Sequence, residues 1–254
     1  MKRTSILASS AILLGLFFIS GNVYAADSTQ MANPSTVQTP VTADLTTPQQ
    51  TTPKPPSDPD DPNDTGNRSN EVTGENKNLG IAYYPKSFTF HGKLGSERLE
   101  LHDSGSNTIT NKATYNVGVK DNTRQYNSWK LTAKLTWDKN ELPGSTITVM
   151  NPNNGEVKKN INDGVNQFKD TDLVEQNDVK GIGSGTVVIN DAETPIMVKQ
   201  STTVGKGTYD YSLGNVESLV LTIPHATDLV AKAYSGNVNW NLQMTPDTAT
   251  TPQG

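Results

Sequence analysis

Residues 129–137 read Trp-Lys-Leu-Thr-Ala-Lys-Leu-Thr-Trp, and apolar and polar residues alternate along this stretch without exception. Successive side chains of a β-strand point to opposite faces, so the pattern predicts one buried face and one solvated face. In a helix the same apolar residues would be spread around the whole circumference. The stretch therefore predicts a long, half-buried strand.

The same alternation and many turn residues recur through the rest of the C-terminal part. Residues 238–244 read Val-Asn-Trp-Asn-Leu-Gln-Met, and Asn154-Gly155 is a dipeptide typical of hairpin turns. Only residues 165–178 are predicted to form a short helix. Further strands are predicted at 87–91, 113–120, 145–150, 185–190, 195–200, 208–213 and 218–223. Many short strands with Gly-rich turns predict an all-β fold, either an antiparallel β-sandwich or a Greek-key barrel.

Composition excludes several classes of function. The chain has 254 residues, of which 33% are hydrophobic, and it has no cysteine. Without cysteine there is no disulfide framework, no thiolate catalysis and no Cys-ligated zinc or iron–sulfur cluster. The net charge of −5 argues against nucleic acid as a partner, because nucleic-acid binders carry basic patches.

The N-terminus is typical of an export signal. Lys2 and Arg3 precede an apolar run from Ile6 to Ile19, which is followed by small residues ending at Ala25. This order predicts a signal peptide over residues 1–25, and the run is too short for a transmembrane helix. No later segment reaches transmembrane length, so the mature protein is expected to have no membrane span and to be secreted.

Residues 26–78 differ in composition from the rest of the chain. They hold eight of the 15 prolines, no aromatic residue, and eight acids against three bases. Such a stretch buries too little apolar area to offset its ordering entropy, and it predicts a disordered acidic linker. Within it, residues 58–66 resemble a calcium loop, but the position that needs a bidentate Glu holds Val72. No metal or other cofactor is predicted.

The remaining residues, 79–254, form one domain-sized unit, and its chemistry gives little sign of an enzyme. Its three histidines, His91, His102 and His225, stand in no catalytic motif. Carboxylate pairs such as Asp170/Asp172 or Glu97/Glu100 are compatible with a glycosidase only at a suitable separation. The protein is therefore predicted not to be an enzyme, and a wall-glycan hydrolase is kept as a minor alternative.

The tripeptide Trp-x-Leu occurs twice, as Trp129-Lys130-Leu131 and as Trp240-Asn241-Leu242. Each copy lies on a predicted strand, and the second is preceded by Val220-Leu-Thr-Ile-Pro224 and followed by Pro246. Together with the signal peptide and the acidic Pro-rich linker, these motifs resemble the WxL-domain surface proteins of Gram-positive bacteria. The resemblance spans roughly residues 79–246; residues 88–92 match the start of the family pattern only loosely.

The resemblance implies non-covalent attachment to the cell wall through peptidoglycan. It also implies companion surface proteins, including a membrane-anchored one, and in some members adhesion to host matrix. Three functions follow: a secreted wall-binding module, an interaction subunit retained by a companion, or, with least support, a hydrolase.

The residues themselves leave the role of the motifs open. Trp129 and Leu131 share one strand face, as do Trp240 and Leu242, and these side chains form either core or an exposed binding patch. The opposite faces carry amides, hydroxyls and amines suited to glycan or wall anions. The candidate binding residues are the two motifs, with an accessory polar face of Thr132, Lys134, Asn239 and Gln243.

Overall fold

The structure is a computed structural model that describes residues 39–46, 51–57, 69–74, 77–105, 113–182 and 185–245. The predicted signal peptide lies outside the described residues. The chain divides into two units, Met1–Asp44 and Leu45–Gly254. All described strands belong to the second unit. Among the described residues, no helix has the length and apolar character that crossing a membrane requires.

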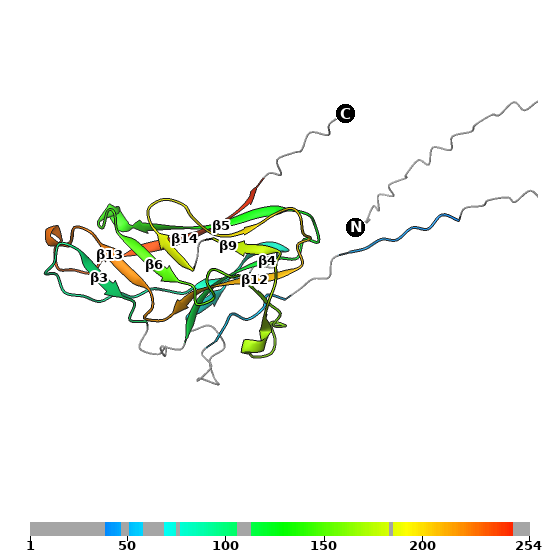
Figure 1. The fold of residues 1–254 in the computed structure, drawn as a ribbon, viewed down its shortest axis with the longest axis horizontal. Coiled ribbons are helices and arrows are strands. Elements are labelled where there is room, and N and C mark those ends of the chain that lie inside the picture. Colours follow the sequence, from blue (N-terminus) through cyan, green and yellow to red (C-terminus); the bar gives the residue numbers. More distant parts are fainter. Residues whose placement is uncertain are drawn as a thin grey trace, which may run out of the picture. The chain divides into compact units, whose positions relative to one another are not determined.

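The strands form three antiparallel sheets (Figure 1). The first sheet contains, in spatial order, β1 (Asn70–Val72), β2 (Leu79–Pro85), β4 (Thr114–Asp121), β12 (Gly207–Asn215), β7 (Lys158–Asn160) and β8 (Leu173–Val174). The second contains β10 (Thr186–Ile189), β6 (Thr146–Met150), β13 (Val220–Ile223) and β3 (Leu99–His102). The third contains β14 (Gly236–Thr245), β5 (Ser128–Trp137), β11 (Thr194–Lys199) and β9 (Val179–Gly181). Single turns of 3₁₀ helix occur at Asp138–Asn140, Asp170–Asp172 and Ala226–Asp228.

One apolar core joins the sheets. The ring of Trp129 on β5 lies 6.1 Å from the ring of Tyr209 on β12, so the third sheet packs against the first. Ile147 and Leu221 of the second sheet belong to the same core. Large aromatic and aliphatic side chains supply most of the apolar area that stabilises such a fold. The prediction of an all-β antiparallel fold is confirmed.

Most predicted strands are confirmed, but residues 87–91 are not a strand. They form only an isolated bridge from Phe90 to Asp103. The predicted helix at 165–178 is also wrong, because this segment holds a 3₁₀ turn and β8 instead. The carboxylate of Asp163 accepts hydrogen bonds from the backbone N–H groups of Val165 and Asn166. Such side-chain acceptors offer the backbone an alternative to helical hydrogen bonds.

The Asn154-Gly155 turn has the backbone that its sequence predicts but not the predicted role. Both residues have positive φ, 52° and 82°. The strands on either side, β6 and β7, do not pair with each other. The turn instead carries the chain from the second sheet to the first, and the prediction of a hairpin is wrong. Local dihedral preference specifies the turn, whereas strand partners depend on distant residues.

Two described parts of residues 26–78 are ordered against the domain, which corrects the prediction for those parts. Residues 70–72 form β1 and pair with β2. Residues Thr51–Ser57, here called the N-terminal strap, bury Pro53, Pro55 and Pro56. The Asn160 amide donates to Lys54 O at 2.8 Å, and the Lys54 backbone N–H donates to Asn162 Oδ1 at 3.1 Å. Proline lacks a backbone donor, so this segment packs on a sheet with few polar groups to satisfy.

Candidate functional site

The two Trp-x-Leu strands, β5 and β14, are neighbours and pair along their whole lengths. Leu242 lies opposite Leu131, and Trp240 lies opposite Ala133. Residues that face each other in an antiparallel pair place their side chains on the same face of the sheet. The fold therefore brings the two motifs, far apart in sequence, onto one continuous face.

The two motifs differ in exposure. Trp129 and Leu131 are 0% exposed and belong to the core. Trp240 and Leu242 are only half-buried. The difference follows from strand order, because β5 lies between β14 and β11 whereas β14 is the edge strand. Trp129 and Leu131 of the first motif are therefore structural, whereas the second motif reaches the surface.

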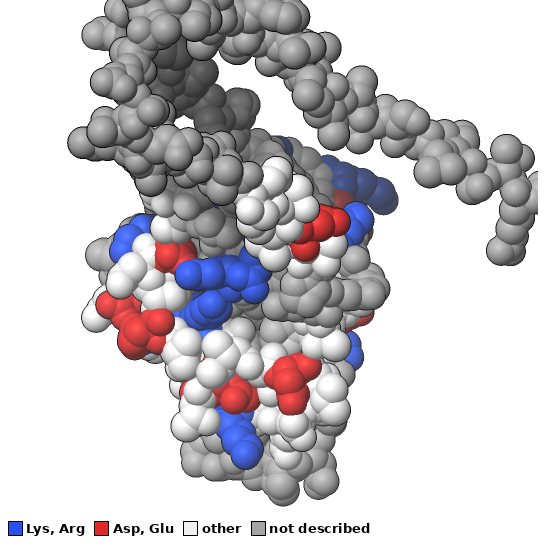
Figure 2. Space-filling model, turned by 90° about the vertical axis from the view of Figure 1, so that its right-hand side faces the viewer, with Lys and Arg blue, Asp and Glu red and all other residues white. Residues whose placement is uncertain are grey.

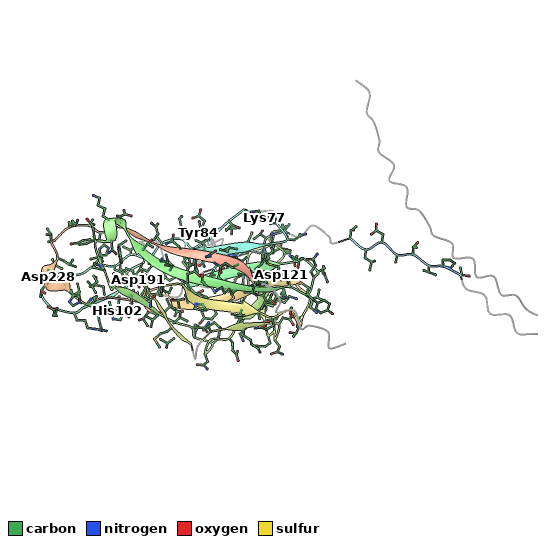
Figure 3. The ribbon with its side chains drawn as sticks, turned by 90° about the horizontal axis from the view of Figure 1, so that it is seen from above. Lys77, Tyr84, His102, Asp121, Asp191 and Asp228 are labelled. Carbon is green, nitrogen blue, oxygen red and sulfur yellow. The ribbon has the colours of Figure 1, made fainter. Side chains whose placement is uncertain are left out.

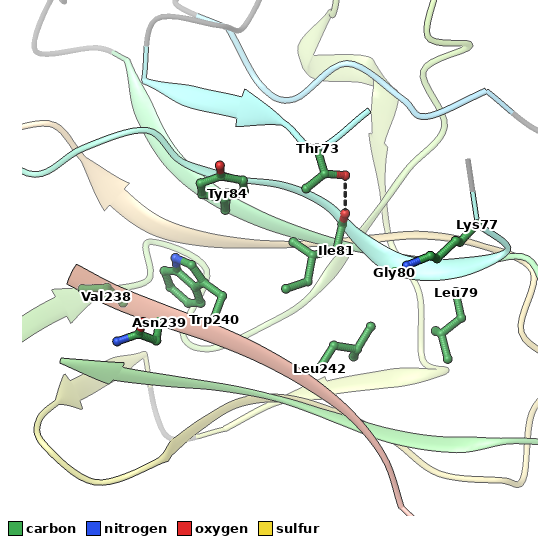
Figure 4. A pocket seen from close by; sticks show the side chains of 10 residues that line it. All are labelled: Thr73, Lys77, Leu79, Gly80, Ile81, Tyr84, Val238, Asn239, Trp240 and Leu242. Atoms are coloured by element: carbon green, nitrogen blue, oxygen red, sulfur yellow. Dashed lines mark hydrogen bonds between the residues drawn. The ribbon is translucent and has the colours of Figure 1, made fainter. Parts of the chain in front are cut away.

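The second motif lines a groove between the third sheet and the first, here called the β14 groove. Its volume is about 560 Å³. Val238, Asn239, Trp240 and Leu242 form one wall; Thr73, Lys77, Leu79, Gly80, Ile81 and Tyr84 form the other. Figure 4 shows Trp240 beside Ile81, and Leu242 facing the strand that carries Leu79. A second cavity of about 1040 Å³ shares Tyr84, Val238 and Trp240 with it. Trp240 thus stands where the two hollows meet.

The indole N–H groups distinguish the three tryptophans. Trp129 Nε1 donates to Asp121 Oδ2 at 2.9 Å, and Trp137 Nε1 donates to Ser145 Oγ at 2.6 Å. The Trp240 N–H makes no hydrogen bond to any residue in the described part of the chain. A half-buried indole with a free donor presents both an apolar face and a polar handle to a ligand.

Basic residues surround the two hollows. Lys77 lines the β14 groove, and Lys86, His91, Lys93 and Lys232 line the second cavity. Of the described residues, no Asp or Glu lines either hollow. Elsewhere the charges are mixed, and Figure 2 shows Lys, Arg, Asp and Glu interspersed on the face in view. The charged residues that line the hollows are therefore all basic, although the chain as a whole has a net charge of −5.

One of these lysines is held by a neighbouring acid. Lys232 Nζ donates to Glu141 Oε1 at 2.6 Å and lies 5.0 Å from the centre of the Tyr234 ring. The hydrogen bond to Glu141 raises the pKa of Lys232 above its usual value. Lys232 therefore stays protonated at neutral pH, and the Glu141 carboxylate balances its charge at the rim.

The predicted polar face is assembled by the same strand pairing. Asn239 lies opposite Lys134, Asn241 opposite Thr132, and Gln243 opposite Lys130. Lys134 and Asn239 are exposed and Lys130 is partly exposed, but Thr132 is buried at 1% and is not accessible to a ligand. Asn239 Nδ2 donates to Thr136 Oγ1 at 2.9 Å and is oriented by that bond. The strand pairing thus joins the two predicted polar rows, and Asn239 of this surface also lines the β14 groove.

Of the histidines and carboxylates considered for catalysis, only His91 lines one of the two hollows, and it lines the second cavity. His225 Nδ1 lies 3.2 Å from Glu97 Oε1 on the surface. Hydrogen bonds from Thr227 and His225 lower the pKa of Glu97. The Asp172 carboxylate accepts from the backbone of Lys169. Neither carboxylate pair lines either hollow, and the described residues contain no group of three His, Asp or Glu that could hold a metal.

One wall of the groove was not predicted from the sequence. Leu79, Ile81 and Tyr84 belong to β2, which was not among the predicted strands. The segment Leu-Gly-Ile-Ala-Tyr-Tyr-Pro alternates only over its first three residues, so its pattern is too short to stand out. Its place opposite β14 depends on the packing of one sheet against another.

Comparison with known families gives one match. The model of the WxL domain, described as a surface cell wall-binding domain, matches residues 32–246. No match was found among curated proteins or among solved structures. The matched region contains the strap, the three sheets and both Trp-x-Leu strands.

Proposed function

Because the chain belongs to the WxL-domain family of cell wall-binding surface proteins, we propose that it is a secreted, non-enzymatic protein of a Gram-positive surface. In this proposal it is exported by residues 1–25 and attaches non-covalently to peptidoglycan. The observation that carries the proposal is Trp240: it is half-buried in the β14 groove and its N–H group is unpaired among the described residues.

The groove has the chemistry that a wall glycan requires. The apolar face of an indole packs on the C–H face of a sugar ring, while the N–H group donates to a hydroxyl. Lys77 and the rim of the second cavity supply cations for carboxylates or phosphates of the wall. A largely apolar hollow with a few converging polar groups is the usual form of a ligand site.

Co-sedimentation with purified sacculi tests this proposal. The mature chain is expected to pellet with sacculi, and Trp240→Ala is expected to stay largely in the supernatant while keeping its folded spectrum. Tyr126→Ala is the matched control, because Tyr126 is an aromatic residue 67% exposed outside both hollows. If both variants sediment equally, the groove is not the wall-binding site. If the folded wild-type chain stays in the supernatant, the protein does not bind the wall directly.

A second function is favoured by the free edge of β14. The strand β14 is ten residues long and, among the described strands, pairs only with β5. It contains no Lys, Arg or Pro. Unprotected edges accept strands from partner proteins. On this reading the protein is an interaction subunit, retained by a membrane-anchored companion or presented to host matrix. Its wall retention in cells then disappears when the companion is deleted, while sedimentation of the purified chain with sacculi is negative.

A further inference from the structure

A lysine is buried in the core next to the first Trp-x-Leu motif. Lys199 is the last residue of β11, lies opposite Trp129 of β5, and its side chain is 0% exposed. Its Nζ donates to the backbone oxygens of Asn127 and Thr203, both at 2.7 Å. A lysine is rarely buried completely, since moving its charge out of water is costly.

An electrophilic carbonyl lies within reach of this amine. Lys199 Nζ is 3.0 Å from Oδ1 of the Asn127 side-chain amide, and Asn127 is only 6% exposed. Because a C=O bond is about 1.23 Å long, Nζ lies within about 4.2 Å of the amide carbon Cγ. Reacting atoms held at about 3–3.5 Å behave as near-attack conformers, so a small rotation of either side chain is sufficient.

The Asp121 carboxylate and the Thr123 hydroxyl lie near both the Lys199 amine and the amide nitrogen of Asn127. Asp121 Oδ2 lies 4.0 Å from Lys199 Nζ, and the Asp121 side chain is 0% exposed. Thr123 Oγ1 donates to Asp121 Oδ1 at 2.7 Å and accepts from Asn127 Nδ2 at 3.2 Å. Asp121, Thr123 and the Asn127 amide nitrogen therefore form one hydrogen-bonded path along which a proton can move.

The surroundings exclude water from this group. The Trp129 indole donates to Asp121 Oδ2 and packs against Tyr209. Gly205 lies so close that a Cβ there would collide with the Asp121 carboxylate, so the 205–207 loop covers it. Figure 3 shows Asp121 at the end of the domain opposite Asp228. An enclosed site strengthens electrostatic interactions and protects a reactive pair from hydrolysis.

We propose that Lys199 and Asn127 join in an intramolecular isopeptide bond, with Asp121 as the proton-transfer residue. The Lys199 ammonium gives a proton to Asp121, and the neutral Nζ attacks Asn127 Cγ. The Nζ–Cγ bond forms, the Cγ–Nδ2 bond breaks, and ammonia leaves after receiving a proton through Thr123. In the overall reaction, the Lys199 ammonium and the primary amide of Asn127 are converted into a secondary amide and a free ammonium ion. Asp121 is a carboxylate again at the end. No oxidant, reductant or co-reactant takes part.

The bond would join the start of β5 to the end of β11 across 72 residues. It would lie two residues before Trp129 and secure the central strand on which β14 pairs. A cross-link of this span constrains the unfolded chain, as a disulfide does in proteins that contain cysteine. This inference is independent of the wall ligand, and its test does not use wall binding.

Intact mass spectrometry of the purified mature chain tests the proposal. The wild type is expected to be lighter than its sequence mass by about 17 Da, one ammonia, and a proteolytic digest is expected to contain a peptide pair joined through residues 127 and 199. Asn127→Ala and Lys199→Met should each show their full sequence mass. If the proton path is correct, Asp121→Asn and Thr123→Val should slow or abolish the loss of ammonia.

Asn151→Ala is the control, since Asn151 is another buried asparagine, at the end of β6. It should retain the loss of about 17 Da. A wild-type chain that keeps its full sequence mass after prolonged incubation overturns the proposal and leaves Lys199 as a structural cation. Because that result comes from the wild type, it does not depend on whether a variant folds. A loss that persists in Lys199→Met also overturns it.

Discussion

Leu131 and Leu242 lie directly opposite each other on neighbouring antiparallel strands, yet Leu131 is fully buried and Leu242 is only half-buried. The same contrast separates Trp129 from Trp240. The inner strand of the pair is covered on both sides, and the edge strand opens onto the β14 groove. The two copies of one motif thus occupy different environments and should respond differently to substitution.

The two tryptophans should differ in their contribution to stability. We expect Trp129→Ala to lower the free energy of unfolding by about 3–5 kcal/mol, because it leaves a cavity in the core and Asp121 without its indole donor. Trp240→Ala should cost clearly less, since its side chain is already partly solvated. Urea denaturation of both variants measures the difference. Equal losses would show that Trp240 is as much a part of the core as Trp129.

The buried Asp210 should make stability depend on pH. Burial raises the pKa of its carboxyl from 3.8 to about 6, and hydrogen bonds from Tyr83 and Asn116 oppose that rise. The folded chain then holds this proton between about pH 4 and pH 6 more strongly than the unfolded chain does. The resulting stabilisation is complete below about pH 4, is lost as the pH rises through 6, and amounts to about 3 kcal/mol.

Comparison with Asp210→Asn isolates this contribution from that of other carboxyls. The stability of the variant relative to the wild type should improve by about 3 kcal/mol between pH 4 and pH 7.5. Denaturation curves across this range provide the measurement. A constant difference would mean that Asp210 has an ordinary pKa in the folded protein.

Tyr83 should stabilise the fold mainly through its hydroxyl. Tyr83 OH donates to Asp210 Oδ2 at 2.7 Å and accepts from Asn160 Nδ2 at 3.2 Å. We expect Tyr83→Phe to cost about 1.5–3 kcal/mol, since a buried carboxylate loses a donor. Tyr84→Phe, on a half-buried neighbour, should change stability by less than about 0.5 kcal/mol. Thermal and chemical denaturation compare the two, and similar losses would contradict the assigned role of the Asp210 contact.

The N-terminal strap should belong to the stable unit. A chain starting at Leu45 should melt at the temperature of the mature protein, because it retains Thr51–Ser57. A chain starting at Ser69 should melt at least about 4 °C lower, since it exposes the surface under the buried prolines and leaves Asn160 and Asn162 without strap partners. Calorimetry of the three chains tests this. Identical melting temperatures would show that the strap contributes nothing to folding.

Much of the fold followed from local pattern. The alternation in residues 129–137 and 238–244 predicted two long strands and their inward faces, because strand geometry depends only on neighbouring residues. The strap was mispredicted because composition records the absence of aromatic residues but not the packing of proline rings on a sheet. The apolar wall supplied by β2 was missed because its alternation is short.

The sequence by itself determined which residues of β5 and β14 share an apolar face and that the fold is all-β. Only the tertiary structure decided that β5 is central and β14 is an edge, and hence that Trp129 is core and Trp240 lines a groove. It also brought Lys199, Asn127 and Asp121 together at the ends of β11, β5 and β4. Burial and proximity depend on which distant strands pair and which sheets face each other, and a period of two residues carries no information about either.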